Sequence, residues 1–309
     1  MVENLAGIAY QRGAACLLAV AAALGAAAAY GAKSDAGTQC PHPIRLVLVD
    51  RATLSALGPL PWPRDRHAKL VRILCDAGAK AVALVFHFKD PASTAGDNAL
   101  AREINRCGRV YVSTGKCDTE PDKAPEDAWF DRMVLPVNGR PPPAILTFQN
   151  IQLPFPKIAG VIAGIGATDR LVDKDMRITG LPLMIMHRER IIPSLALRIF
   201  LDLEGIRGPF FLTRRKYLKI SGNRITLDKY GSILVNLTPP GSAYSHYSFV
   251  DVMRERVRPA NFRDAIVIVG IADPKMDVNT AVGPKSSMEL IADQLVTIYQ
   301  YVSERRASR

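Results

Sequence analysis

The stretch IRLVLVDRATLSALGPLPWPRDRHAKLVRILCDAGAKAVALVFHF, residues 44–88, contains the pattern that decides the fold. It begins with the apolar run Ile44–Asp50 and ends with a second apolar run, Ala81–Phe88. Between them, apolar residues recur at helical spacing from Arg66 to Lys80, and Gly78 supplies a stop signal. Two buried strands joined by a helix predict parallel strands with a right-handed crossover.

The same alternation of helix and strand continues beyond this stretch. A second helix is predicted from Asp97 to Gly108, and a third strand from Arg109 to Thr114. Near the end of the chain, Asp264–Gly270 is again strand-like, and Met288–Val302 reads as an amphipathic helix. The sequence therefore predicts an α/β fold with a mostly parallel central sheet flanked by helices.

The middle of the chain departs from this pattern. Residues 115–156 are rich in proline and turn residues, which indicates an irregular excursion over the sheet. Polar and apolar residues alternate on both sides of Ser221–Asn223, and a second turn is expected near Gly231. Such alternation predicts a β-rich antiparallel insertion within one α/β domain.

Residues 13–32 carry no charge and are long enough to cross a bilayer as a helix. Ala21, Gly25 and Ala29 recur every fourth residue, a spacing that lets membrane helices approach closely. A cleaved signal peptide is an alternative, with Ala29–Gly31 as the cleavage triplet. We favour an uncleaved signal anchor, with residues 1–12 cytoplasmic, residues 13–32 in the lipid bilayer and residues 33–309 outside the cytoplasm.

Export would place the cysteines in an oxidising compartment. Cys107 and Cys117 flank a short strand-like stretch and could form a disulfide across it. Cys75 lies among apolar residues of a predicted helix, where a buried thiol is expected. No Cys-x-x-Cys pair occurs in the sequence, so neither a zinc ribbon nor a thioredoxin-like site is indicated.

The formal net charge of +11 would suit an anionic partner, but the basic residues are scattered and not interleaved with aromatic residues. We therefore expect no nucleic-acid partner. The histidines are isolated from one another, with His67 expected on a helix surface and His87 in the core or at an interface. We expect no metal, no cofactor and no catalytic residues, because neither metal-ligand spacings nor nucleophile motifs occur.

Four residues are candidates for ligand binding because they follow predicted strands or begin a helix. Asp50 ends the first strand, where open α/β sheets bind ligands, although it could equally cap the next turn. Arg64 offers a planar donor to an anion, or it forms an ion pair with Asp50 or Asp65. Gly270 and Asp273 lie at the end of the last predicted strand.

The blocks LVLVD, LGPLPWPRDRHAKLV, GAKAVALVF, DKDMR, PSLAL, ILVN, YSFVDVM, FRDAIVIVG and MELIADQL occur in this order between residues 46 and 295. In residue types and order they resemble the CHASE2 family, an extracytoplasmic sensory domain of bacterial transmembrane receptors. Departures from the family occur at Val85, Met176 and Ile291, where members commonly place polar residues or a glycine. The resemblance assigns signature positions to Trp62, Pro63, Gly78, Asn236 and Asp251.

With one membrane segment at residues 13–32, we expect a single-pass protein of the bacterial inner membrane, with most of the chain in the periplasm. The resemblance itself implies further transmembrane helices and a cytoplasmic cyclase or kinase after the sensor. Members commonly continue into a cytoplasmic effector, whereas this sequence stops at Arg309. Our first hypothesis is therefore a non-enzymatic binding or scaffolding subunit of an envelope complex, or a sensor acting in trans. Its partners would be other membrane or periplasmic proteins. The alternative is a periplasmic sensor that binds a small molecule and feeds a separate kinase or cyclase.

Overall fold

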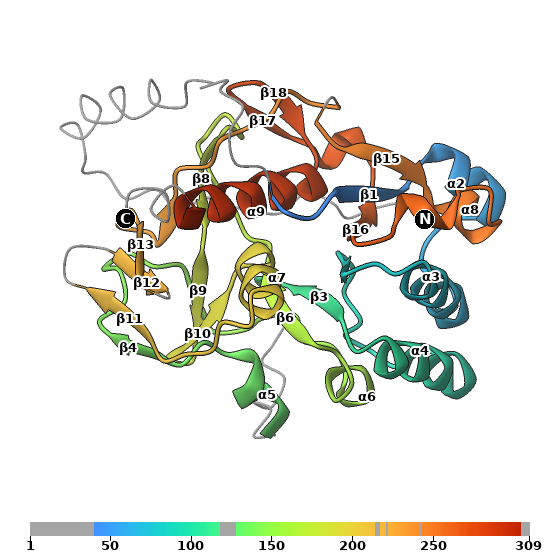
Figure 1. Cartoon of the computed structure of the whole chain (residues 1–309), viewed down its shortest axis with the longest axis horizontal. Coiled ribbons are helices and arrows are strands. Elements are labelled where there is room, and N and C mark those ends of the chain that lie inside the picture. The colour runs from blue at the N-terminus through green and yellow to red at the C-terminus, as the bar shows by residue number, and fades with distance from the viewer. Residues whose placement is uncertain (1–39, 118–127, 214–216, 221, 242, 304–309) are drawn as a thin grey trace, which may run out of the picture.

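A six-stranded sheet forms the centre of the molecule (Figure 1). The structure is a computed structural model that describes residues 40–117, 128–213, 217–220, 222–241 and 243–303. Every neighbouring pair of strands in this sheet is parallel, so the predicted α/β fold with a largely parallel sheet is confirmed. The strand order is β15 (Ser245–Ser248), β1 (Ile44–Val49), β16 (Ile266–Ile271), β2 (Ala81–Leu84), β3 (Val110–Thr114) and β6 (Gly164–Ala167).

Helices cover both faces of this sheet (Figure 1). Side chains of β1 alternate between two apolar cores: Leu46 belongs to one and Val47 to the other, and both are fully buried. A strand buried on both faces is apolar throughout, which explains the uninterrupted apolar runs in the sequence. One face carries α7 (Leu195–Leu203) and α9 (Ser287–Ser303), and the other carries α3 (Arg64–Asp76), α4 (Thr94–Cys107) and α6 (Pro156–Ala159).

Shorter elements complete the fold. The hairpin predicted around Ser221–Asn223 is present, and a second turn follows in which the Gly231 backbone N–H donates to the Asp228 carbonyl. The short helices are α2 (Arg51–Leu57), α5 (Ala128–Met133) and α8 (Phe249–Met253), with 3₁₀ turns at Pro259–Asn261 and Pro274–Met276. The short strands are β4 (Val137–Gly139), β5 (Thr147–Phe148), β7 (Leu171–Val172), β8 (Ile178–Pro182), β9 (Met184–His187), β10 (Arg190–Pro193), β11 (Phe210–Thr213), β12 (Tyr217–Ile220), β13 (Asn223–Thr226), β14 (Ser232–Ile233), β17 (Val278–Thr280) and β18 (Gly283–Lys285).

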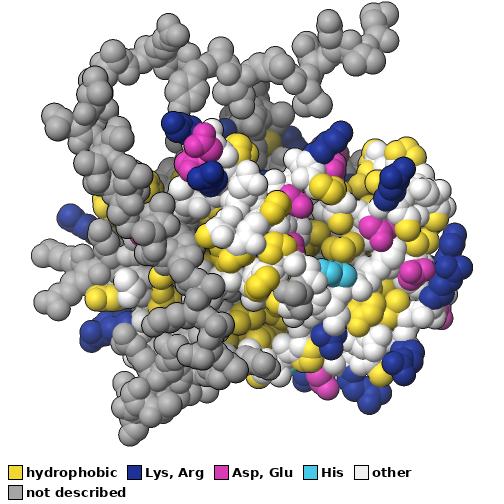
Figure 2. Space-filling model, turned by 90° about the horizontal axis from the view of Figure 1, so that it is seen from above, with side chains coloured by type: hydrophobic (Ala, Val, Ile, Leu, Met, Phe, Trp, Pro, Cys, Tyr) yellow, Lys and Arg dark blue, Asp and Glu magenta, His cyan; other side chains and the backbone are white. Residues whose placement is uncertain are grey.

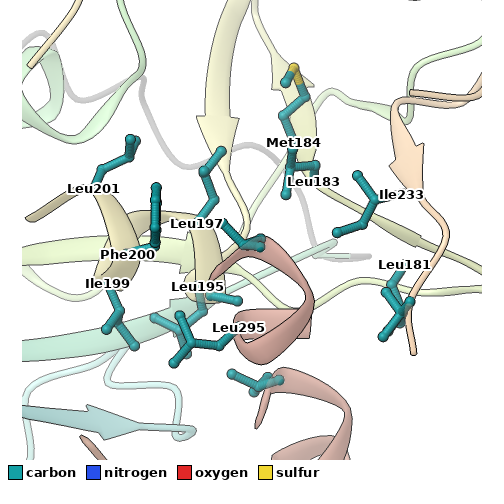
Figure 3. Close-up of a cluster of buried hydrophobic side chains, with 14 of the residues drawn as sticks. Leu181, Leu183, Met184, Leu195, Leu197, Ile199, Phe200, Leu201, Ile233 and Leu295 are labelled. Carbon is teal, nitrogen blue, oxygen red and sulfur yellow. The ribbon is translucent and has the colours of Figure 1, made fainter. Parts of the chain in front are cut away.

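The β-rich region shares its core with the α7 and α9 layer of the sheet. Figure 3 shows Leu197 and Phe200 of α7 in the same buried cluster as Met184, the first residue of β9, and Leu183, which precedes it. All four side chains are fully buried. The same apolar cluster contains Leu218 of β12, so side chains of the insertion and of the parallel sheet bury each other.

Two strands of the central sheet carry no clear sequence signal, and β6 shows why. Its sequence is Gly-Ile-Gly-Ala, and glycine is depleted in strands because it offers no side chain to pack. A Cβ at Gly166 would lie 2.2 Å from Leu195 Cα, and one at Gly164 would lie 2.7 Å from Arg198 Cδ. The glycines therefore allow α7 to approach the strand closely, a requirement that strand propensity does not report.

A disulfide joins Cys75 of α3 to Cys107 of α4, and the two Cα atoms are 5.8 Å apart. The predicted pairing of Cys107 with Cys117 is therefore wrong, as is the expectation of a buried thiol at Cys75. Cys107 precedes β3 and Cys117 follows it, and a strand of five residues is about 16 Å long. That length exceeds the Cα separation that a disulfide spans, whereas the C-terminal ends of α3 and α4 lie side by side.

The predicted membrane segment, residues 13–32, lies outside the described residues. Within the part of the chain that the structure does describe, no helix is long and apolar enough to span a bilayer.

Candidate functional site

A polar cavity of about 280 Å³ lies where three neighbouring strands of the central sheet end. His87 follows β2, Gly115 and Lys116 follow β3 directly, and Thr168–Arg170 follow β6. Parallel strands place their carboxyl ends at one edge of the sheet, which is where open α/β folds bind ligands. The cavity therefore occupies the expected position for a binding site, and Gln152 completes its wall.

The segment around Gln152 is fixed to the end of β3 by backbone and side-chain hydrogen bonds. The Gln152 N–H donates to the Gly115 carbonyl at 2.8 Å, and the Thr114 hydroxyl donates to the Gln152 carbonyl at 2.7 Å. The Cys117 N–H donates to the Asn150 carbonyl at 3.1 Å. These bonds hold the Gln152 side chain in the cavity wall.

Asp169 places a carboxylate in the same wall. Its Oδ1 accepts a hydrogen bond from the Lys116 backbone N–H at 3.1 Å, whereas its Oδ2 is buried without a hydrogen-bond partner among the described residues. The Oε1 atom of Gln152 is likewise buried without one. Burial raises the pKa of Asp169, although the Lys116 N–H and the charges of Arg170 and Lys116 oppose this rise. Two acceptor oxygens at this edge thus lack donors, at a cost of about 1–3 kcal/mol each.

Positive charge lies beside these acceptors. Lys116 is exposed at the rim of the cavity, and Arg170 is half-buried. The guanidinium of Arg170 donates to Ser287 Oγ, at the start of α9, over 3.1 Å. His87 is exposed, so the predicted core position is wrong, whereas the interface alternative stays a prediction. Loss of hydration around its ring lowers its pKa, so the ring is neutral at pH 7. The charged groups of the wall are therefore two cations and one carboxylate.

A second, smaller cavity of about 20 Å³ adjoins this wall on the side of α9. It shares residues 168–170 with the larger cavity, and Ser287 and Gln294 of α9 line its other side. The side-chain amide of Gln294 donates to the Leu181 and Pro182 carbonyls at 3.3 and 3.0 Å. Residues 168–170 thus lie between the polar cavity and the last described helix.

The four predicted ligand residues do not line the larger cavity. Asp50 caps α2, since its Oδ1 accepts from the Thr53 N–H at 2.8 Å and from the Ser248 hydroxyl at 3.0 Å. Burial alone would raise the pKa of Asp50, but these hydrogen bonds outweigh it and lower the pKa. Asp273 accepts from the Lys275 N–H at 3.0 Å and begins a 3₁₀ turn.

Gly270 and Arg64 are also held by their neighbours. A Cβ at Gly270 would lie 2.5 Å from Met288 Sδ, so Met288 of α9 packs directly against the Gly270 backbone. Arg64 Nε lies 3.8 Å from Asp97 Oδ1, and its guanidinium lies 4.7 Å from the centre of the Phe88 ring. Its ionic partner is thus Asp97 rather than Asp50 or Asp65. Ligand binding by these four residues stays a prediction.

The signature residues of the sequence lie in structural positions. Pro63 immediately precedes α3, and Gly78 follows it with a φ of +85°, a conformation that favours glycine. Asn236 Nδ2 donates to Gln300 Oε1 of α9 at 2.7 Å. Asp251 lies in the first turn of α8, where its exposed carboxylate is 3.3 Å from Arg256. Trp62 is buried against α3 and α8, as described below.

Four residues of the cavity wall were not predicted from the sequence: Lys116, Gln152, Asp169 and Arg170. A signal for three of them is present in the sequence: polar residues follow directly after the strands Val110–Thr114 and Gly164–Ala167. Asp169 and Arg170 can be predicted as site residues only if Gly164–Ala167 is first predicted as a strand. Gln152 carries no such signal, because its place depends on pairing with the end of β3.

The described residues contain no cluster of three or more His, Cys, Asp or Glu side chains that could hold a metal ion. Comparison with known proteins gives no significant match to a curated protein or to a solved structure. A family model described as the CHASE2 domain matches residues 15–309, nearly the whole chain. The chain therefore belongs to the CHASE2 family of extracytoplasmic sensory domains.

Proposed function

We propose that this protein is an exported, non-enzymatic sensory domain that binds a small polar molecule in the cavity at the carboxyl edge of its sheet. The observation that carries the proposal is a pair of buried oxygens, Asp169 Oδ2 and Gln152 Oε1, that have no hydrogen-bond donor among the described residues and belong to side chains lining a 280 Å³ cavity. A bound molecule that supplies these donors would remove their desolvation cost, which gives binding a source of free energy.

Two features support export and membrane anchoring as parts of the proposal. Residues 13–32 are uncharged and long enough to act as a signal anchor in the inner membrane. The disulfide between Cys75 and Cys107 suits an oxidising compartment such as the periplasm. Sensory domains in this location report on molecules outside the cytoplasm, and the signal would pass to a separate kinase or cyclase.

Thermal unfolding of the full-length protein in detergent tests small-molecule binding. Adding a fraction of small polar metabolites should raise the midpoint of unfolding, because a ligand that binds only the folded state stabilises it. The bound compound is then identified by mass spectrometry after release from the washed protein.

A matched pair of glycine variants locates the binding. A Cβ at Gly115 would lie 3.2 Å from Asp169 Oδ2, so Gly115→Val should fill this side of the cavity and abolish the thermal shift. Gly160→Val is the control, because Gly160 is exposed at the end of α6 with a φ of −68°. No shift with the unmodified protein, or an equal shift with Gly115→Val, would reject the proposal.

Binding to a protein partner is a second candidate, favoured by exposed apolar side chains. Met176 and Met276 are 56% and 55% exposed and lie on neighbouring loops, since Arg177 pairs with Asn279. Exposed apolar side chains that lie together are typical of interaction surfaces. Purification from membranes should recover a partner with the unmodified chain and less of it with Met176→Ser and Met276→Ser combined. Recovery of the monomer alone would count against this candidate.

A further inference from the structure

The charged groups in the cavity wall indicate which class of molecule fits. Lys116 and Arg170 bear positive charge, and the Asp169 carboxylate lies between them in sequence order and within reach of both charges. Arg170 uses one hydrogen bond for Ser287, and a guanidinium has five N–H donors. The wall thus offers donors and positive charge on Lys116 and Arg170, and acceptor oxygens on Asp169 and Gln152.

A ligand with a single charged group would match only part of this wall. A simple carboxylate would pair with Lys116 and Arg170 but would leave Asp169 Oδ2 and Gln152 Oε1 without donors, and would add negative charge beside Asp169. A simple amine would pair with Asp169 but would meet the two cations. Since unpaired buried polar groups and like charges both weaken binding, neither class is a good match.

The volume of the cavity limits the size of the ligand. At about 280 Å³ it lies just below the roughly 300–1,000 Å³ that is typical of sites for drug-sized molecules. A molecule of a few to about ten non-hydrogen atoms is of suitable size, by comparison with the ~30 Å³ that one water occupies in the liquid.

We propose that the cavity binds a small zwitterion of the α-amino acid class, with its carboxylate at Lys116 and Arg170 and its ammonium group at Asp169 and Gln152. Each charged group of the ligand then meets the opposite charge, and the ammonium group supplies the donors that the two oxygens lack. This inference rests on the proposed function, since it assigns a ligand class to the same cavity.

Titration calorimetry with the full-length protein in detergent tests the ligand class. The probes are the twenty standard amino acids, with acetate and ethylamine as half-molecules that each carry one charge. Glycine betaine is a further probe, since it keeps both charges but has no N–H donors. At least one amino acid should bind at least tenfold more tightly than acetate, ethylamine or betaine, as expected for one charge-assisted hydrogen bond.

Two variants and their matched controls test whether Asp169 and Lys116 bind the charged groups of the amino acid. Asp169→Asn and Lys116→Gln should each weaken amino-acid binding about tenfold or more. Lys80→Gln and Asp264→Asn are controls, because this exposed ion pair (3.5 Å) lies beside the amino end of β2, opposite the cavity. The controls should bind the amino acid with unchanged affinity, and circular dichroism should show that all four variants are folded.

The outcomes separate the ligand class from the proposed function. If a neutral or singly charged compound from the metabolite fraction binds and Gly115→Val abolishes its binding, the zwitterion proposal is overturned but the sensory site stands. If no compound binds the unmodified protein, both are rejected. If an amino acid binds equally well to Asp169→Asn, Lys116→Gln and the controls, the placement of its charges is rejected.

Discussion

Trp62 determines how the chain passes from the first strand to the first long helix. Its side chain is 4% exposed, and the indole Nε1 donates to the Gly58 carbonyl at 2.9 Å. The ring centre lies 5.1 Å from that of Phe249 in α8 and 6.2 Å from that of His67 in α3. The indole therefore packs between two helices, which explains why a tryptophan stands in a proline-rich turn.

We expect Trp62→Ala to lower the free energy of unfolding by about 3–5 kcal/mol, because it removes a large buried side chain and leaves a cavity. Urea unfolding followed by circular dichroism measures the change. Trp62→Phe should cost less, since it keeps an aromatic ring and loses mainly the hydrogen bond to Gly58. A near-neutral Trp62→Ala variant would contradict the packing role.

His67 shows how the surroundings of one side chain change its chemistry. The sequence predicted a helix-surface position, but the side chain is 3% exposed and packs edge-on against Phe86 and Phe88. Burial, assisted by the charge of Arg64, lowers the pKa of His67 from 6.5 to about 4. The ring is therefore neutral in the folded protein over a pH range in which an unfolded chain would be protonated.

At the scale of elements, a buried ionic network links α9 to the residues that precede it in the chain. Lys285 Nζ contacts Asp293 Oδ2, and neither side chain has any exposed surface. Lys285 also donates to the Thr238 carbonyl at 2.8 Å, and Asp293 Oδ1 accepts from the Thr238 and Tyr244 hydroxyls, both at 2.7 Å. The two charges thus meet hydrogen-bond partners on Thr238 and Tyr244, and these bonds link both residues to α9.

We expect Asp293→Asn and Lys285→Met each to lower the free energy of unfolding by about 3–5 kcal/mol, because each leaves an uncompensated buried group. Combining Asp293→Asn with Lys285→Met should cost less than the sum of the two single changes. Denaturant unfolding of the four proteins gives these values. Asp251→Asn, in an exposed ion pair, serves as the control and should change stability little. If the double variant loses as much free energy of unfolding as the two single variants together, Lys285 and Asp293 do not act as a coupled pair.

Helix α9 also contacts the candidate site. Arg170 donates to Ser287, the first residue of α9, while residues 168–170 line the polar cavity. A carboxylate that binds Arg170 would act on the residue that joins the cavity to this helix. Helix α9 is therefore in direct contact with the wall of the cavity.

At the scale of the whole molecule, charge is spread over the surface instead of forming one block. Figure 2 shows lysine and arginine side chains along the edge of the described part of one face, with acidic side chains among them. On the described part of this face, the basic residues that contribute to the net charge of +11 do not form a single basic patch.

The stability of the whole molecule should fall as the pH drops from 7 to 5. The unfolded chain protonates His67 near pH 6.5, whereas the folded protein does so only near pH 4, so protons favour the unfolded state in this window. The contribution of His67 is about 2 kcal/mol between pH 7 and pH 5. His87 and His187 act in the same direction, since burial lowers the pKa of each, whereas Asp169 and Asp277, whose pKa values burial raises, act in the opposite direction.

Urea unfolding at pH 7, 6 and 5 measures this dependence, with His67→Phe as the matched variant. Phenylalanine suits the aromatic surroundings and cannot be protonated, so the variant should lose about 2 kcal/mol less than the unmodified protein between pH 7 and pH 5. Equal slopes for the two proteins would show that His67 is not responsible.

The periodicity of the sequence predicted the elements that are long or buried on both faces. The strands β1, β3 and β16 and the helices α3, α4 and α9 lie within a few residues of the predicted ranges. β2 ends at Leu84, earlier than the predicted Phe88, since the chain leaves the sheet to reach the edge where His87 lies. β6 and β15 were not predicted because their four-residue sequences lack the apolar alternation that marks a strand.

The sequence by itself determined the α/β class, the parallel core and the membership of the CHASE2 family, because these follow from local periodicity and from motifs in a fixed order. Only the tertiary structure decided the disulfide partner and the candidate site. The site joins residues that follow strands ending at Leu84, Thr114 and Ala167, which are far apart in the chain and adjacent in the sheet. Pairing between strands, and the close approach of α7 to Gly166, are contacts at long range, and no local pattern reports them.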